Sequence, residues 1–301
     1  MSRSEHAPAG ASPQLRSAVL RWYDRHGRDL PWRDPECTPW GIYLSEVMSQ
    51  QTPVARVQPI WERWLERWPT PADLAADSPG EAVRMWDRLG YPRRALRLHA
   101  SAVAMVERHD GEVPRDHDDL LALPGVGAYT AAAVASFAFG DPRTVVDTNV
   151  RRVLTRAVSG DEHAAPALTV AESRLAARSM PEDVTEANAW NAAVMELGAL
   201  VCTARSPRCT DCPVLDRCAW QLAGRPEHVG PARRGQAWHG TDRQVRGRIV
   251  QRLRESADPI DRASLASVWP EDEAKVDRCL AGLVEDGLVE PLAGDRYALP
   301  S

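Results

Sequence analysis

Four cysteines in a short segment constrain this chain more than any other feature of its sequence. Cys202, Cys209, Cys212 and Cys218 follow the spacing C-x6-C-x2-C-x5-C, and Pro213 comes directly after the third. Thiolates this close in sequence can ligate one metal centre, either a zinc ion or an iron–sulfur cluster. Zinc sites more often use two CxxC pairs, and this segment has one, so the spacing favours the cluster. A disulfide pair is the weakest of the three interpretations.

Length and charge set broad limits on the kind of protein. The chain has 301 residues, enough for two or three compact units, and no run of roughly 18 apolar residues that would span a membrane. Residues 1–13 lack an apolar signal core and are expected to be a disordered tail. A thiolate-bound cluster is maintained under reducing conditions, so we expect a cytoplasmic protein. We also expect the protein to be a monomer.

Basic residues are clustered although the net charge is −5. Arginine supplies 36 of the 37 basic residues, and short arginine runs lie within 93–97, 151–156 and 205–217. Local clusters of this kind matter more for nucleic-acid binding than the net charge does. An arginine bias inherited from genome composition is an equally good explanation at this point.

Apolar periodicity predicts an all-α chain up to about residue 220. The predicted helices cover 14–26, 41–51, 54–68, 79–88, 93–109, 116–122, 128–138, 148–158, 167–177 and 186–200. A Gly/Pro/Arg-rich stretch, 223–240, is predicted to be a linker. Helices near 242–255, 261–267 and 271–286, followed by a short hairpin over 288–299, are typical of a winged-helix-like domain. Such a domain contacts DNA or protein, or serves packing alone.

Three motifs carry candidate chemistry. The segment Leu123–Thr130 contains Gly125 and Gly127 between two predicted helices, a turn that suits a phosphate at a helix N-terminus but also a plain helix–turn–helix link. Asp147 stands where a helix N-cap is expected, and its carboxylate is equally suited to stabilise a developing cation. Glu46 is the one charged residue between Trp40 and Val54, opposite the apolar face of its helix. It is either a solvated side chain or a carboxyl that holds a proton as a general acid.

Together these motifs resemble one family. The helix-hairpin-helix segment LPGVGAYTA, the aspartate in VVDTNV and the cysteine spacing resemble the endonuclease III superfamily of base-excision DNA glycosylases. The segment SEVMSQQT at 45–52, with LPWR at 30–33 and LGY at 89–91, resembles the MutY-type adenine DNA glycosylases within it. The resemblance covers roughly residues 14–222. It implies a two-lobed helical fold, with 14–30 and 140–222 as the lobe bearing a [4Fe-4S] cluster loop and 31–139 as a six-helix lobe, followed by a C-terminal domain at 241–301.

The resemblance also implies an activity and a role for each matching residue. The implied reaction is hydrolytic removal of adenine paired with 8-oxoguanine or guanine in double-stranded DNA, after the base is flipped out of the stack. Glu46 would protonate adenine, Asp147 would stabilise the oxocarbenium-like sugar, and Tyr129 would orient Asp147. Tyr129 stands where bifunctional members of the superfamily have a nucleophilic lysine, so a lyase step is not expected.

The remaining matches concern DNA and base contacts and the cluster. The residues that match adenine-pocket positions are Arg28, Leu30, Trp32 and Arg33, and those that match positions contacting the DNA are Gln51, Thr52, Tyr91, Gly125, Val126, Gly127 and Asn149. The four cysteines would bind the cluster. A monovalent cation held by the hairpin carbonyls is compatible with the superfamily.

The match departs from the family in three places. Ala192 occupies a position that usually carries a base-contacting Glu or Gln, and Pro92 replaces the second tyrosine of a common GYY. The residues after the linker are too few for the usual Nudix-like domain that reads 8-oxoguanine. Two alternatives therefore stay open: a mismatch glycosylase that removes thymine or a damaged pyrimidine opposite guanine, and a DNA-binding module with a vestigial site.

Overall fold

The chain forms two compact units, in a computed structural model that describes residues 9–227 and 239–301. The first unit comprises Met1–Pro35 with Gly127–Ala232, and the second comprises Glu36–Val126 with Arg233–Ser301. Most of the predicted tail and most of the predicted linker lie outside the described residues, and the predicted lobe boundaries stay a prediction. None of the described helices is long and apolar enough to cross a membrane.

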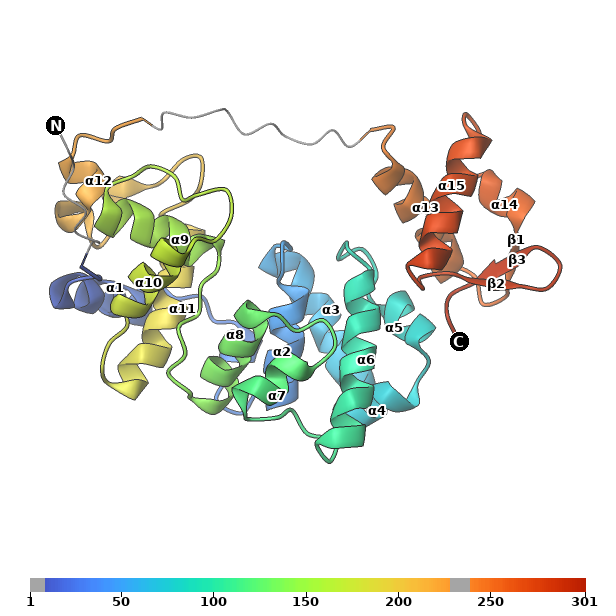
Figure 1. The fold of residues 1–301 in the computed structure, drawn as a ribbon, viewed down its shortest axis with the longest axis horizontal. Coiled ribbons are helices and arrows are strands. Elements are labelled where there is room, and N and C mark those ends of the chain that lie inside the picture. Colours follow the sequence, from blue (N-terminus) through green and yellow to red (C-terminus); the bar gives the residue numbers. More distant parts are fainter. Residues whose placement is uncertain (1–8, 228–238) are drawn as a thin grey trace. The chain divides into compact units, whose positions relative to one another are not determined.

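The first unit is built on three helices that enclose one core. Its elements are α1 (Pro13–His26), η1 (Pro31–Arg33), α8 (Ala128–Phe139), α9 (Thr148–Leu154) continuing as the π-helical turn η2 (Thr155–Ser159), α10 (Val170–Arg178), α11 (Val184–Leu200), η3 (Cys209–Asp211), η4 (Leu215–Arg217) and α12 (Ala219–Leu222). α11 packs against both α1 and α9 (Figure 1). Val19, Val153, Trp190 and Leu197 are buried in this core, and Cys218 lies at its edge.

The second unit begins with six helices whose core is rich in tryptophan. They are α2 (Pro39–Met48), α3 (Val54–Arg67), α4 (Pro71–Ala76), α5 (Pro79–Met85), α6 (Arg93–Arg108) and α7 (His117–Ala122). α6 packs against α2, α4 and α5. The buried ring of Trp64 stands edge-on to Trp68 and Trp86, with centroids 4.9 and 5.6 Å away. Such aromatic pairs add to the stability that area burial provides.

Serine or threonine followed by proline marks the start of four helices. Ser12, Thr38, Thr70 and Ser78 are the N-caps of α1, α2, α4 and α5, and a proline follows each of them. Each hydroxyl accepts a hydrogen bond from a backbone amide of the first turn, and the proline needs no donor there. The short helix α4 was not predicted, although its cap signal is present in the sequence.

The helix predicted over 41–51 ends early, at Met48. Gln51 has a φ of 55°, which a right-handed helix cannot contain, and Pro53 then caps α3. Through residue 227 the described part of the chain contains no strand, as predicted.

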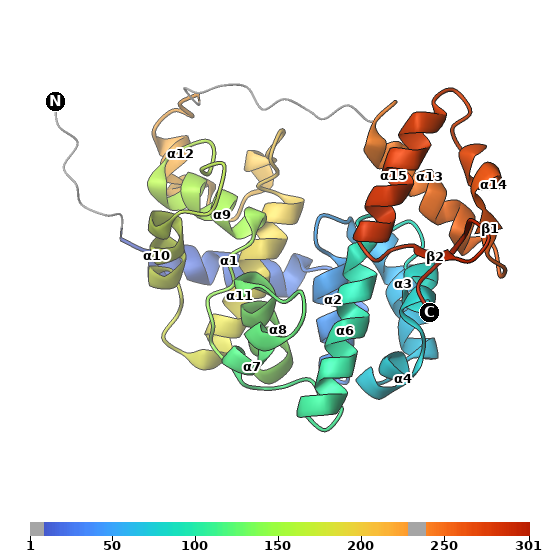
Figure 2. The ribbon, with the colours of Figure 1, turned by 45° about the vertical axis from the view of Figure 1, so that its right-hand side comes forward.

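The C-terminal region combines three helices with a small sheet. Its elements are α13 (Asp242–Arg254), β1 (Ile260–Asp261), α14 (Arg262–Ala266), α15 (Glu273–Glu285), β2 (Glu290–Leu292) and β3 (Arg296–Ala298). The strands are antiparallel in the order β1-β3-β2, and Tyr297 pairs with both Ile260 and Pro291. α13 and α15 pack side by side (Figure 2). The predicted helices and hairpin are present, whereas β1 was missed because two residues cannot show an alternating pattern.

Candidate active site

Asp147 caps α9 in the first unit, and its carboxylate is held at both oxygens. Oδ1 accepts the Val150 amide at 2.6 Å, and Oδ2 accepts the Asn149 side-chain amide at 2.6 Å. Burial raises the pKa of Asp147, while these two hydrogen bonds and the charge of Arg152 oppose the rise. The residue is therefore an N-cap and a desolvated carboxyl group at once, so the two interpretations of the sequence do not exclude each other.

A second set of contacts fixes the backbone that leads into Asp147. The buried side chain of Asn191 accepts the Val145 amide at 3.2 Å and donates to the Arg143 carbonyl at 2.7 Å. Tyr129 is half-buried on α8 and packs against Ala132, Ala133 and Val145. Its predicted hydrogen bond to Asp147 stays a prediction.

Asn149 and Arg152 connect Asp147 to the cysteine-rich loop. The Asn149 side-chain oxygen accepts Arg152 Nη2 at 2.6 Å, and Arg152 Nε donates to the Cys202 carbonyl at 2.6 Å. Arg152 also donates to the Gly198 carbonyl at 2.7 Å. A Cβ atom at Gly198 would lie 2.6 Å from the Cβ of Asn149, so only glycine lets α11 approach α9 this closely.

The cysteine-rich loop is held by a buried arginine that the sequence did not single out. Arg156, 2% exposed, donates to the carbonyls of Thr203 at 2.7 Å and Ala204 at 3.1 Å, and to Cys202 Sγ at 3.5 Å. Its guanidinium also lies 5.1 Å from the ring centroid of Trp220. One side chain of η2 thus ties both ends of the loop to the core.

The donor set of this loop fits an iron–sulfur cluster. Burial, together with the charges of the other three cysteines, raises the pKa of Cys212 to about 12, so the four sulfurs share one neighbourhood. Within the described ranges no three His, Cys, Asp or Glu side chains converge closely enough to hold one metal ion. A four-iron cluster takes four thiolates, and this loop supplies four cysteines. Nothing in the described part of the chain pairs these cysteines as a disulfide.

Two residues predicted to line an adenine pocket converge on one buried carboxylate. Glu196, on α11 and 1% exposed, accepts Arg28 Nε at 2.7 Å and Arg33 Nη2 at 2.9 Å. Burial alone would raise the pKa of Glu196, but the hydrogen bonds from the two guanidinium groups lower it to about 2. Leu30, which lies between Arg28 and Arg33 in the sequence, is buried, and Trp32 in η1 is half-buried. Glu196 was missed, yet it is the only charged residue between Glu186 and Arg205, the same signal that marked Glu46.

Glu46 is the one acidic side chain on a helix that is otherwise buried. In α2 every residue from Trp40 to Met48 is buried except Glu46, which is half-buried. The helix is anchored through Tyr43, whose hydroxyl donates to Ser101 Oγ at 2.8 Å, and Ser101 in turn donates to the Pro124 carbonyl at 2.7 Å. The carboxyl-bearing helix and the hairpin are thus linked through α6 within the second unit.

Arg94 organises the loops that carry Gln51 and Tyr91. It is 6% exposed and donates to the carbonyls of Val47, Met48, Gln50 and Gly90, at 2.9, 3.1, 2.7 and 3.0 Å. Its Nη2 also donates to the Thr52 hydroxyl at 3.1 Å, and that hydroxyl donates to the Leu89 carbonyl at 3.2 Å. Nothing in the sequence separates Arg94 from its neighbours Arg93 and Arg97. It was counted in a basic run, but it is an internal brace.

The three predicted DNA contacts near this brace differ in accessibility. Gln51 and Tyr91 are exposed, with φ angles of 55° and 48°. Thr52 is 8% exposed and engaged in the brace, so its predicted contact with the opposite base stays a prediction.

The helix-hairpin-helix turn needs only one of its glycines for backbone reasons. Gly125 has a φ of +79° and packs against the side chain of Arg97, whereas Gly127 has a φ of −108° and open space beside it. The Val126 amide already donates to the Leu123 carbonyl at 3.1 Å. Among the three predicted phosphate-binding amides, that of Val126 therefore also closes the turn.

Comparisons with known proteins agree on one kind of protein. A model described as HhH-GPD superfamily base excision DNA repair protein matches residues 44–177, and one described as the iron-sulfur binding domain of endonuclease III matches 202–218. Among solved structures, a thermostable thymine-DNA glycosylase gives a TM-score of 0.61 at 27% identity, over 69% of this chain and 95% of that chain. Endonuclease III in a non-covalent DNA complex gives 0.59 at 27% identity, over 69% and 94%.

Relatives in the curated proteins resolve the branch. The adenine DNA glycosylase of Mycolicibacterium smegmatis is 55% identical over 281 residues, covering 93% of this chain and 94% of that protein. The adenine DNA glycosylase of Mycobacterium tuberculosis is 50% identical, covering 94% and 92%. The human protein of the same name is 42% identical over 215 residues, covering 68% of this chain and 39% of that protein. A match over 93% of this chain cannot end at the cysteine-rich loop, so it includes part of the C-terminal region. The cluster loop, the helix-hairpin-helix turn and these relatives together show that this chain is a DNA-binding glycosylase of the adenine DNA glycosylase family, within the HhH-GPD superfamily of base excision DNA repair proteins.

Proposed function

We propose that this chain removes adenine mispaired with 8-oxoguanine or guanine from duplex DNA by hydrolysis of the N-glycosidic bond. The observation that carries the proposal is identity of 50–55% with adenine DNA glycosylases along nearly the whole chain. The thymine-DNA glycosylase, at 27% identity, is the less similar protein, so removal of thymine is the weaker alternative. We also propose that the protein is cytoplasmic and that it is a monomer. Light scattering in solution tests the oligomeric state.

In the proposed reaction two carboxyl groups act at different steps. Glu46, half-buried on an apolar helix, donates a proton to the adenine ring, because a neutral base leaves more readily than an anion. The bond between base and sugar then breaks with its electron pair going to the base. Asp147, whose carboxyl oxygens accept hydrogen bonds from Asn149 and Val150, stabilises the positive charge that develops on the sugar, and water completes the hydrolysis.

The other residues bind and position the substrate. Arg28 and Arg33, pinned by Glu196, present rigid guanidinium groups next to Leu30 and Trp32 for the extruded base. Gln51 and Tyr91 enter the base stack, Gly125 and Gly127 hold a phosphate, and Tyr129 orients Asp147. A [4Fe-4S] cluster on Cys202, Cys209, Cys212 and Cys218 stabilises the loop that Arg152 and Arg156 tie to α9, and it supplies no electrons to a hydrolysis.

One assay distinguishes the candidate functions. Duplexes with A:8-oxoG, A:G and T:G pairs are incubated with the protein and treated with hot alkali to reveal abasic sites. We expect cleavage at A:8-oxoG, less at A:G and little at T:G, and a loss of roughly 10²–10⁴-fold for Glu46→Gln. Glu66→Gln, the same change at an exposed position of α3, is the matched control. Preferred cleavage at T:G would reject the adenine assignment, and strand nicking without alkali would reject the role of Tyr129.

A further inference from the structure

A groove lined by nine arginines lies in the second unit, beside the loops of Gln51 and Tyr91. It has a volume of about 1060 Å³, and its walls are the Gln50–Gln51 and Asp87–Arg97 segments on one side and α13 on the other. Five of the arginines belong to the first wall or to α3, and four, Arg243, Arg246, Arg248 and Arg254, belong to α13. The segments of both walls belong to the same compact unit.

The residues that line this groove carry far more positive than negative charge. Asp87 is the one acidic residue that lines it. Asp286 is not a lining residue, but its carboxylate pairs with Arg93 at 3.1 Å and with Arg246. Desolvation, opposed by the charge of Asp87 and assisted by the like charge of Arg84, lowers the pKa of Arg254 to about 10. So many like charges in one cavity repel one another, and an anionic partner removes that repulsion.

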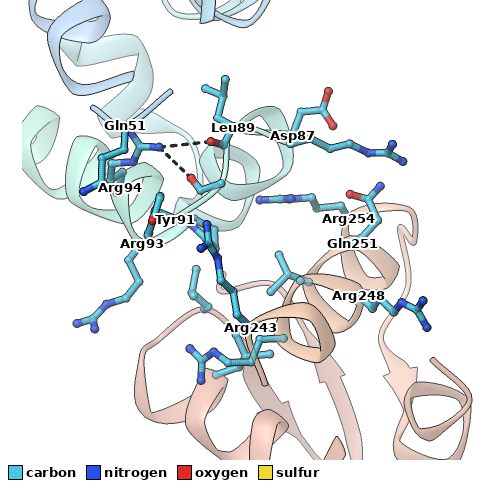
Figure 3. Close-up of a pocket in the computed structure, with 18 of the residues that line it drawn as sticks. Gln51, Asp87, Leu89, Tyr91, Arg93, Arg94, Arg243, Arg248, Gln251 and Arg254 are labelled. Carbon is cyan, nitrogen blue, oxygen red and sulfur yellow. Dashed lines mark hydrogen bonds between the residues drawn. The ribbon is translucent and has the colours of Figure 1, made fainter. Parts of the chain in front are cut away.

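The two walls meet at Tyr91. The guanidinium of Arg94 lies 5.6 Å from the Tyr91 ring centroid, and that of Arg243, reaching across from α13, lies 4.9 Å from it (Figure 3). α13 therefore contacts the residue that is expected to enter the base stack. On the opposite side Arg97, another lining residue, packs against Gly125 of the hairpin. One lining residue of the groove thus also contacts the hairpin turn, which is expected to hold a DNA phosphate.

The chemistry of the groove fits a run of phosphates better than a base or a small anion. Guanidinium groups bind phosphate oxygens through paired hydrogen bonds, and several of them spread along an open groove match the repeating charge of a DNA strand. The side-chain acceptors that could read the donor edge of a base are one carboxylate, that of Asp87, and four glutamine amides, against nine guanidinium groups. Contacts of this kind position DNA without reading its sequence.

We propose that α13 and the Gln51/Tyr91 loops form one binding groove for the DNA backbone, so that the C-terminal region holds the strand next to the excision site. The proposal rests on the proposed function, because it takes the DNA duplex as the substrate. It assigns to residues 241–301 a role in sequence-independent affinity, whereas the sequence alone left DNA contact, protein contact and packing open.

The test measures binding of the full chain to a fully paired duplex over a range of salt concentrations. For Arg243→Gln with Arg248→Gln we expect weaker binding and a slope of log Kd against log salt that falls by roughly 2, since each lost phosphate contact removes about 0.9. Arg243→Lys with Arg248→Lys keeps the charge and is expected to keep the slope. Arg252→Gln is the matched control, because Arg252 is exposed on the same helix but does not line the groove.

Each other outcome rejects the groove in a recognisable way. An unchanged slope in the double glutamine variant, or an equal change in Arg252→Gln, would show that these arginines do not contact the backbone. Displacement of DNA by inorganic phosphate beyond the effect of chloride at equal ionic strength would make the groove a small-anion site. Excision at A:8-oxoG by the unmodified chain is measured in parallel. This measurement distinguishes failure of the proposed glycosylase activity from failure of the proposed DNA binding in the groove.

Discussion

Replacing Glu196 by glutamine is expected to destabilise the first unit, because the carboxylate is the shared anion of Arg28 and Arg33. The pKa of Glu196 lies at about 2, against an ordinary value of 4.5, although burial by itself would raise it. A depression of this size corresponds to about 3 kcal/mol of stability at neutral pH, since one pKa unit is about 1.4 kcal/mol. Glutamine keeps the shape and some hydrogen bonds but loses the charge, and two arginines then remain without their anion.

The pH dependence gives this prediction its sign. Because the folded-state pKa is below that of the unfolded chain, the stabilisation is present above pH 4.5 and is lost as the pH falls toward 2. In thermal melting monitored by circular dichroism, we expect the melting temperature of Glu196→Gln to be roughly 6–12 °C lower than that of the unmodified protein at neutral pH. The gap should stay constant down to about pH 5 and narrow at lower pH.

A control on the same helix separates this effect from a general effect of charge removal. Glu186 is exposed in the first turn of α11, and Glu186→Gln should change the melting temperature by little. Equal melting temperatures for Glu196→Gln and the unmodified protein would refute the reasoning, as would a gap that widens in acid. Loss of the anion should also loosen Arg28 and Arg33, so we expect the KM for the A:8-oxoG duplex to rise.

Three further changes test the geometry around the two carboxyl groups. Asn149→Ala removes a 2.6 Å hydrogen bond to the Asp147 carboxylate, so the pKa of Asp147 should rise. The acid limb of the pH profile of excision should then move to a higher pH by roughly 1–2 units. An acid limb that does not move would contradict the role of that hydrogen bond. Gly198→Ala places a Cβ atom 2.6 Å from that of Asn149 and should lower stability by about 1–3 kcal/mol in thermal melting, whereas a neutral effect would mean that α9 and α11 separate freely. Arg94→Ala leaves several buried carbonyls without a donor and should cost at least about 3 kcal/mol, with faster amide exchange in the Gln51 and Tyr91 loops; unchanged exchange there would show that the loops do not depend on Arg94.

Local signals in the sequence determined much of the site. The cysteine spacing, the glycine turn and the Ser/Thr-Pro helix starts each act over a few residues, so they can be recognised without knowing the fold. A single charge in an apolar run was also informative: it marked Glu46, and the same signal in α11 marks Glu196. All of these features depend on the chemistry of neighbouring residues along the chain.

The tertiary structure decided which distant residues share a charge or a hydrogen bond. Arg94 and Arg156 are buried donors to backbone carbonyls, whereas Arg93 and Arg97 are exposed and Arg151 and Arg152 are half-buried. Burial is a property of the packed fold and cannot be read from the runs themselves. The shared carboxylate of Glu196 lies more than 160 positions from Arg28 and Arg33 in the sequence, so no local pattern could pair them. The arginine groove likewise draws its walls from segments far apart along the chain, and its charge becomes concentrated only where packing brings them together.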